Sequence, residues 1–310
     1  MNRLSANLLL LFVGLIWGLG FVAQQTAMDD IGPLQFVAVR FLIAFLVVAP
    51  FAYAETRRYF AQPNATPLTF GDMALIANVG LMFFLGMAFQ QVGLLGTTVT
   101  NSGMLTGLYV VIVPMIAALL FGQNQPRIIW GAAAIAFAGI WFLGGGSLDG
   151  FNWGDVLTII CAVFNALQVI LVGKAVNQIK RPVFVATIQF GLSGVLGFVC
   201  FAFARSIDWS LEPEFTTDTL LQALPAVLYA AIVAGGLAFT LQAVAQRYTR
   251  PADAAILLSS EALFAALGGM VILAERLNFI GYLGCGLLLS AIVIVSVISA
   301  KLEAQALKVS

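Results

Sequence analysis

The sequence contains ten apolar runs of about 20 residues each, separated by short polar stretches. An α-helix needs about 20 residues to cross roughly 30 Å of hydrocarbon, so every run has the length of a transmembrane helix. A transmembrane β-barrel would show shorter segments in which apolar and polar residues alternate. We therefore expect an all-α membrane protein with ten transmembrane helices. The predicted spans are 7–27, 33–54, 73–95, 99–121, 128–148, 155–174, 183–204, 220–246, 252–274 and 279–300.

Two segments half a chain apart are similar to each other. Residues 241–277 align without a gap on residues 89–125 at an offset of 152, which pairs Gln90 with Gln242, Thr97 with Thr249 and Tyr109 with Glu261. An offset of 149 pairs Arg40 with Gln189. We predict two five-helix repeats, at 7–148 and 155–300, joined by the glycine-rich segment 144–154. Five crossings per repeat place the second repeat upside down, an arrangement that usually encloses a central substrate cavity near the midplane.

The basic residues predict the orientation in the membrane. With the N-terminus inside, eleven Lys and Arg residues fall on the cytoplasmic side and two fall outside. This bias predicts a multi-pass protein of the inner (plasma) membrane with both termini cytoplasmic. The net charge is zero, so nothing suggests a nucleic-acid partner. The acidic outer residues are expected to form a solvated connector; they are Asp208, Glu212, Glu214 and Asp218.

Two charged residues lie deep inside predicted spans, where a charge is costly unless it faces a partner or a wet cavity. Arg40 is expected about 10 Å below the outer surface, and Glu261 about 15 Å from the cytoplasmic side. Two interpretations remain open. Arg40 and Glu261 form an ion pair that joins two helices, or Glu261 binds a substrate ammonium group or carries a proton.

The residue inventory limits the chemistry. Protons are a candidate partner in addition to a small-molecule substrate. The chain has no histidine, so coupling to protons would depend on carboxylates, of which Glu261 is the deepest. Without histidine there is no Ser-His pair and no HExxH zinc motif, which argues against an enzyme. The three cysteines fall inside spans and are interpreted as packing residues. No cofactor or metal site is expected.

Trp17 lies about ten residues into the first span, whereas the other tryptophans lie near predicted span ends. Its indole either packs on a neighbouring helix or lines a cavity, while Gly14 and Gly18 form a GxxxG packing face. Polar side chains at similar depth either join helices or line the same cavity. The predicted substrate-binding residues are Trp17, Thr106, Tyr109, Asn165, Gln168, Tyr229, Ser260 and Glu261.

Several segments resemble the drug/metabolite transporter superfamily, in its ten-helix EamA-type branch. The resemblance rests on Trp17-Gly18, Pro33 with Arg40, residues 97–109 (TTVTNSGMLTGLY) and residues 248–277, and it covers about 8–297. The branch typically has Glu-Pro in the ninth helix and Gly-Glu-Arg at its end, where this chain has Glu261-Ala262 and Ala274-Glu275-Arg276. The missing proline weakens a mechanism that needs a kink there, although Pro114 could bend the fourth helix.

The resemblance implies a ten-helix bundle around a central cavity and a permease that exports small metabolites, commonly amino acids. The chain is also similar to aromatic amino acid exporters of the YddG type. The helix pairs joined at 96–98 and 247–251 are the expected gates. The alternatives are a multidrug or cationic compound exporter, a channel, and a non-transporting membrane receptor or structural protein.

Overall fold

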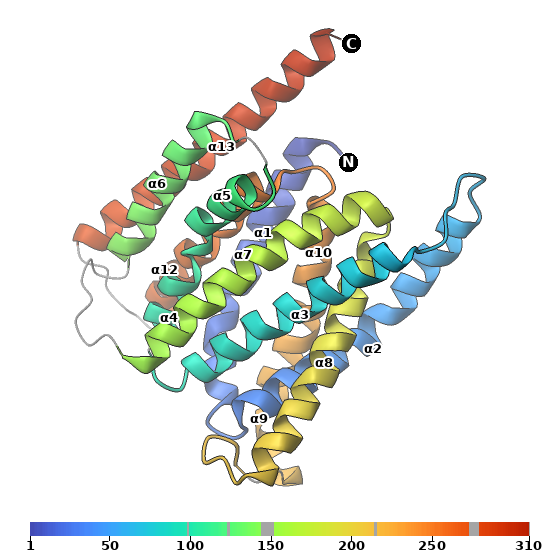
Figure 1. Ribbon diagram of the computed structural model, residues 1–310. Coiled ribbons are helices and arrows are strands. Elements are labelled where there is room, and N and C mark those ends of the chain that lie inside the picture. The colour runs from blue at the N-terminus through green and yellow to red at the C-terminus, as the bar shows by residue number, and fades with distance from the viewer. Residues whose placement is uncertain (98, 123–124, 144–151, 214–215, 273–278, 310) are drawn as a thin grey trace.

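The computed structural model describes residues 1–97, 99–122, 125–143, 152–213, 216–272 and 279–309 (Figure 1). The joining segment 144–151 and the Ala274-Glu275-Arg276 motif lie outside these residues. In the part described, every regular element is a helix. The protein is therefore an all-α membrane protein, as its apolar runs predict.

Ten helical stretches follow one another along the described chain. The first repeat contains α1 (Arg3–Ala27), α2 (Pro33–Phe60), α3 (Phe70–Gly93), α4 (Val99–Thr106) with α5 (Tyr109–Leu119), and α6 (Arg127–Leu143). The second contains α7 (Trp153–Ile179), α8 (Pro182–Ser206), a stretch made of α9 (Thr217–Leu228), η1 (Tyr229–Leu237) and α10 (Ala238–Ala245), then α11 (Pro251–Leu258) with α12 (Ser260–Ile272), and α13 (Phe279–Val309). Seven described stretches are long and apolar enough to cross a membrane, and α6 and residues 279–295 of α13 are shorter apolar helices.

Local sequence signals set the helix starts. Proline occupies the first turn of α2, α8 and α11, where its missing N–H costs no helical hydrogen bond. Capping boxes begin α3, through Thr69 and Asp72, and α7, through Asn152 and Asp155. The capping boxes satisfy backbone N–H groups that would otherwise lack partners.

The helix packing is symmetric under exchange of the two repeats. The equivalent helices α2 and α8 pack on each other, and so do the equivalent helices α6 and α13. Helix α3 packs along α7, and in the same way α1 packs along η1 and α10. Helix α1 also contacts α11 and α12, as α7 contacts α4 and α5. The bundle is thus built from two five-helix inverted repeats.

Figure 1 shows the N- and C-termini on one side of the bundle, at the top of the view. We call this the terminus side. It also carries the ends of α2, α7 and α10 and the starts of α8 and α11. The opposite side carries the α8–α9 connection, shown at the bottom of the view.

The fourth and ninth helical stretches are interrupted at equivalent places. Helix α4 ends at Thr106 and α5 begins at Tyr109, while α11 ends at Leu258 and α12 begins at Ser260. At both breaks the backbone changes to tighter hydrogen bonds, from Val110 N to Gly107 O and from Ala262 N to Ser259 O. The residue after Glu261 is alanine where the EamA-type branch typically has proline, and the helical stretch is interrupted beside it all the same.

Candidate functional site

A cavity lies between the two repeats at the level of these breaks. Its total empty volume, which includes space open to solvent, is about 610 Å³, and about 50 Å³ can hold the centre of a water-sized molecule. Helices α1, α2, α3, α4, α5, α7, α10, α11 and α12 and the π-helical turn η1 contribute to its wall. Residues from both repeats therefore face one enclosed space.

Arg40 brings a buried positive charge to this cavity. Its guanidinium donates hydrogen bonds to Gln24 Oε1 (3.0 Å) and to the sulfur of Met87 (3.0 Å). It also lies over the ring of Phe41, 4.4 Å from the centroid, which orients the charged plane by a cation–π contact. The side chain is only 4% exposed, and its Nε has no hydrogen-bond partner among the described residues. A substrate anion would satisfy this charge.

Glu261 brings a buried carboxylate to the same cavity. It lies in the first turn of α12, where free backbone N–H groups favour a negative charge. The Tyr109 hydroxyl lies next to the carboxylate, at the start of α5. Glu261 Oε1 and the Tyr109 hydroxyl are both buried without a hydrogen bond of regular geometry in the described chain. The break before α12 therefore presents an acceptor to the cavity.

The ion pair between Arg40 and Glu261, one of the two interpretations left open by the sequence, does not form in the described structure. Both side chains line the cavity, but no charged atoms of the two lie within 4.0 Å in the described structure. The guanidinium interacts with the residues of α1, α2 and α3 named above, while the carboxylate lies beside Tyr109. The cavity thus contains two opposite charges that do not neutralise each other through direct contact.

Trp17 both packs and lines the cavity, so its two interpretations hold together. Its indole N–H donates to the carbonyl of Ala234 (3.0 Å), and its ring lies 4.4 Å from that of Phe239. Ala234 belongs to η1, and this bond satisfies a carbonyl in a segment of irregular helix. The predicted GxxxG packing face is confirmed. A Cβ on Gly14 would collide with Ser260, and one on Gly18 would lie 2.6 Å from the Glu261 carbonyl.

Most of the predicted polar residues also reach the cavity. Thr106 accepts a hydrogen bond from Gln90 (3.1 Å), and Asn165 donates to Cys161 (3.2 Å). Gln168 donates to Gln189 (3.2 Å) and accepts from Gln242 (3.4 Å). The predicted residues that line the cavity are Trp17, Arg40, Thr106, Tyr109, Asn165, Gln168 and Glu261.

Two predicted substrate-binding residues lie elsewhere. Tyr229 donates its hydroxyl to the Ile16 carbonyl (3.1 Å) and so joins η1 to α1. Ser260 faces Gly14 in the packing face between α1 and α12. Neither is among the residues that line the cavity.

Other lining residues were not predicted. They include Phe21, Gln24, Met87, Gln90, Phe239 and Gln242. Gln90 and Gln242 are identical residues at equivalent positions of the two repeats, so this pair could have been identified from the sequence. Phe21, Phe239 and Met87 could not be identified in this way, because nothing in the sequence distinguishes them from the other residues among 25 phenylalanines and 8 methionines.

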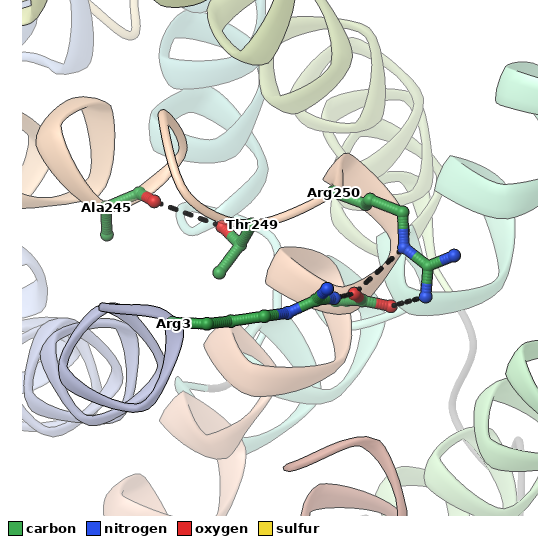
Figure 2. Close-up of polar contacts among 5 residues, drawn as sticks. Arg3, Ala245, Thr249 and Arg250 are labelled. Carbon is green, nitrogen blue, oxygen red and sulfur yellow. Dashed lines mark hydrogen bonds and ion pairs between the residues drawn. The ribbon is translucent and has the colours of Figure 1, made fainter. Parts of the chain in front are cut away.

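An ion cluster joins the start of α1 to α11 on the terminus side (Figure 2). Arg3 at the start of α1 pairs with Asp253 of α11, and Arg250 also donates to this carboxylate through Nε (3.1 Å) and Nη2 (3.2 Å). The Thr249 hydroxyl donates to the Ala245 carbonyl (3.2 Å) and fixes the turn before α11. Asp253 lies in the first turn of α11 and is completely buried.

On the opposite side, the equivalent elements with the repeats exchanged are also in contact. The Thr97 hydroxyl, after α3, donates to the carboxylate of Asp155 at the start of α7. The chains approach closely here, because a Cβ on Gly93 would lie 2.9 Å from the Gly154 carbonyl. Asp155 is 1% exposed and also accepts from the Asn152 backbone N–H (2.9 Å).

The sequence predicts a solvated connector on the opposite side, but part of this connector is buried. Glu212 is 1% exposed, and its carboxylate accepts the backbone N–H of Leu34 at the start of α2. Arg205 donates to the Glu212 carbonyl (3.1 Å). Burial raises the pKa of Glu212 from its ordinary value of 4.5 to about 7. Glu214 lies outside the described residues.

The helical bundle, its inverted repeats and its central polar cavity define a multi-pass membrane protein of the transporter class. The sequence profile of the EamA-like transporter family matches residues 4–145 and 152–297. The chain belongs to the EamA-like transporter family. The family is one of transporters, so a small-molecule substrate follows from this membership.

Related chains agree with this assignment. An uncharacterized transporter of Archaeoglobus fulgidus is 34% identical over 295 residues, which cover 95% of this chain and 87% of the relative. The uncharacterized transporter YwfM of Bacillus subtilis is 26% identical over 298 residues, or 94% of this chain and 93% of the relative. A protein known from a crystal structure shares the fold, with a TM-score of 0.71 at 16% identity over 96% of this chain and 99% of that one.

Proposed function

We propose that this protein exports small zwitterionic metabolites, foremost amino acids, as a secondary transporter of the inner membrane. The observation that supports the proposal is the presence of Arg40 and Glu261 in one cavity without an ion pair between them. A substrate carboxylate would bind the guanidinium, and a substrate ammonium group would bind the carboxylate. Charge-assisted hydrogen bonds of this kind are stronger than neutral ones.

The apolar part of the cavity supports a substrate with an apolar or aromatic side chain. Trp17 and Phe239 form a tilted aromatic pair, and Phe21 and Met87 line the same space. Aromatic rings favour edge and offset contacts with another ring. We therefore include aromatic amino acids, as transported by the YddG type, among the substrates to be tested.

Alternating access is the proposed mechanism. The ion cluster of Arg3, Arg250 and Asp253 would close the terminus side, and the contact of Thr97 with Asp155 would close the opposite side. Opening either side requires the turn between two helices to move away from the first helix of the other repeat. The positive-inside bias of the sequence supports a cytoplasmic terminus side. Protons are the proposed coupling ion, with Glu261 as the carrier.

Export of cationic compounds is a second candidate function. A buried carboxylate beside Trp17 and Tyr109 would suit an aromatic cation, through charge and cation–π contacts. Arg40 in the same cavity opposes this candidate, because it would repel a ligand without an anionic group.

Counterflow into proteoliposomes tests the proposal. Vesicles that contain the purified protein are loaded with one unlabelled compound and diluted into trace radiolabelled compound. We expect labelled amino acids to accumulate, whereas an aromatic cation and a matched amine without a carboxylate do not. Accumulation of the cation alone would support the second candidate. Binding without exchange of any tested compound would indicate a receptor and overturn the proposal.

A further inference from the structure

A second hollow lies at the terminus side, away from the central cavity. Its empty volume is about 880 Å³, and it opens between the end of α2, the start of α8 and the turn after α10. Arg58, Lys180 and Arg247 line it, each from a different one of these three regions, and all three side chains are exposed. This hollow therefore gathers cations from segments far apart in the sequence.

The protein neutralises the positive charge of this hollow only in part, through Glu55, which interacts electrostatically with Arg247. Glu55 is the carboxylate that lines it, and its two oxygens accept the backbone N–H groups of Val183 (3.3 Å) and Phe184 (2.8 Å). Glu55 is thus engaged at the start of α8. In the described chain, the head groups of Arg58, Lys180 and Arg247 have no hydrogen bond or ion pair. An anion would complete this set of charges.

One wall of this hollow is apolar and is formed by the lipid-exposed surface of α2. Phe51, on this wall, is 67% exposed, as is Leu46 one and a half turns deeper on the same helix. Val183 lines the hollow, and its neighbour Phe184 lines a groove between α2, α3 and α8 in which every lining residue is apolar. A ligand with both a charged head and a hydrocarbon tail matches these two environments.

We propose that the hollow binds an anionic phospholipid, with its phosphate held by Arg58, Lys180 and Arg247 and an acyl chain along the apolar surface of α2 and α8. Cations at a membrane surface attract anionic lipids, and here they surround one hollow at the polar end of spanning helices. A soluble phosphate compound would use the cations and leave the apolar wall unmatched. The inference does not depend on the transported substrate.

Native mass spectrometry of the full chain in detergent tests the proposal, with phosphatidylglycerol and phosphatidylcholine as probes. The test variant combines Arg58→Gln, Lys180→Asn and Arg247→Gln; asparagine is chosen because Lys180 has a φ of 61°. The control variant combines Arg57→Gln, Lys174→Gln and Arg127→Gln, which removes the same charge from exposed residues outside the hollow. Thermal melting in detergent checks that both variants are folded, and Arg58→Gln alone replaces the triple variant if it is not.

We expect the unchanged protein to retain phosphatidylglycerol in preference to phosphatidylcholine. Each cation removed should weaken binding of the anionic lipid roughly threefold to fivefold, and all three should weaken it on the order of 30- to 100-fold. The control variant should bind as the unchanged protein does. Equal losses in the two triple variants would overturn the proposed site. Displacement by millimolar glycerol phosphate, which has no acyl chains, would show a soluble phosphate ligand and overturn the lipid assignment.

Discussion

Arg3 in the first helix forms an ion pair with Asp253, 250 positions later in the chain. The residue equivalent to Arg3 at the repeat offset of 152 is Asp155, which accepts a hydrogen bond from Thr97 on the opposite side. On each side, therefore, the first helix of one repeat contacts the turn between the third and fourth helices of the other. These paired contacts are where the two proposed gates can be tested.

Asp253→Asn should weaken closure of the terminus side, because a neutral amide attracts Arg3 and Arg250 less than a carboxylate does. The measurement is maleimide labelling of Thr106→Cys in the cavity, in a chain whose native cysteines are replaced by alanine. We expect a rise of about threefold to tenfold in labelling rate, equivalent to about 1 kcal/mol. Asp72→Asn, at the start of α3 on the same side, is the control. Equal rates in the two variants would contradict a gating role for the ion cluster.

Arg40→Gln and Glu261→Gln should have reciprocal effects on substrate binding. The first variant loses the partner of the substrate carboxylate, and the second loses the partner of its ammonium group. Each loss should weaken binding of an amino acid by about 10- to 100-fold, the effect of removing a hydrogen bond to a charged group. Competition assays should show that Arg40→Gln spares an amine without a carboxylate and that Glu261→Gln spares the matching acid. Uniform loss for every ligand would indicate a structural role for both residues.

Glu261→Gln should also remove the pH dependence of transport. The chain has no histidine, and Glu261 is the carboxylate that lines the central cavity. Uptake into proteoliposomes is measured from pH 5 to pH 8, with Tyr109→Phe as a control that keeps the carboxylate. A pH profile in Glu261→Gln that matches the unchanged protein would exclude proton coupling through this residue.

Gly18→Ala should destabilise the bundle by about 1–3 kcal/mol, because the new Cβ would lie 2.6 Å from the Glu261 carbonyl and 2.7 Å from the Ala265 backbone N. Neither backbone atom can turn away as a flexible side chain would. Gly131→Ala in α6 is the matched control, since nothing lies within 4 Å of its Cβ position. Thermal melting in detergent should show a lower Tm for the first variant only.

Glu212→Gln should change how stability depends on pH. Because the pKa of Glu212 is raised to about 7, the folded protein favours the neutral carboxyl group, and this contribution is lost as pH rises through about 7. The Tm of the unchanged protein should thus fall relative to that of Glu212→Gln between pH 5 and pH 8, by about 2–4 °C. Asp218→Asn, at an exposed position in the first turn of α9, should show no such difference. A parallel pH dependence for all three proteins would contradict this role.

The sequence predicted the elements that follow from local composition. Apolar runs gave the helices, and the repeat offset indicated two five-helix repeats, while the contacts of Arg3 with Asp253 and of Thr97 with Asp155 are seen in the structure alone. The sequence also singled out Arg40 and Glu261 as charged residues inside apolar spans, and both side chains line the central cavity. Depth alone does not give the direction of a side chain around its helix, so the two were also candidates for an ion pair that does not form.

The errors arose where tertiary contacts decide the environment. Glu212 lies in a loop that reads as polar, but its burial depends on the start of α2, 178 residues earlier. Ser260 and Glu261 are neighbours in α12, and because consecutive residues of a helix point about 100° apart, the serine faces Gly14 and the acid faces the cavity. The sequence places both at the same depth and cannot separate them.

The two repeats match in packing but differ in charge at their equivalent positions. Arg40 corresponds to Gln189, and Glu261 corresponds to Tyr109. A central cavity with full twofold symmetry would accept a molecule equally well in either direction. With one cation and one anion contributed by different repeats, the proposed site instead imposes a single orientation on an amino acid, and a third contact at Trp17 would then distinguish its mirror-image forms.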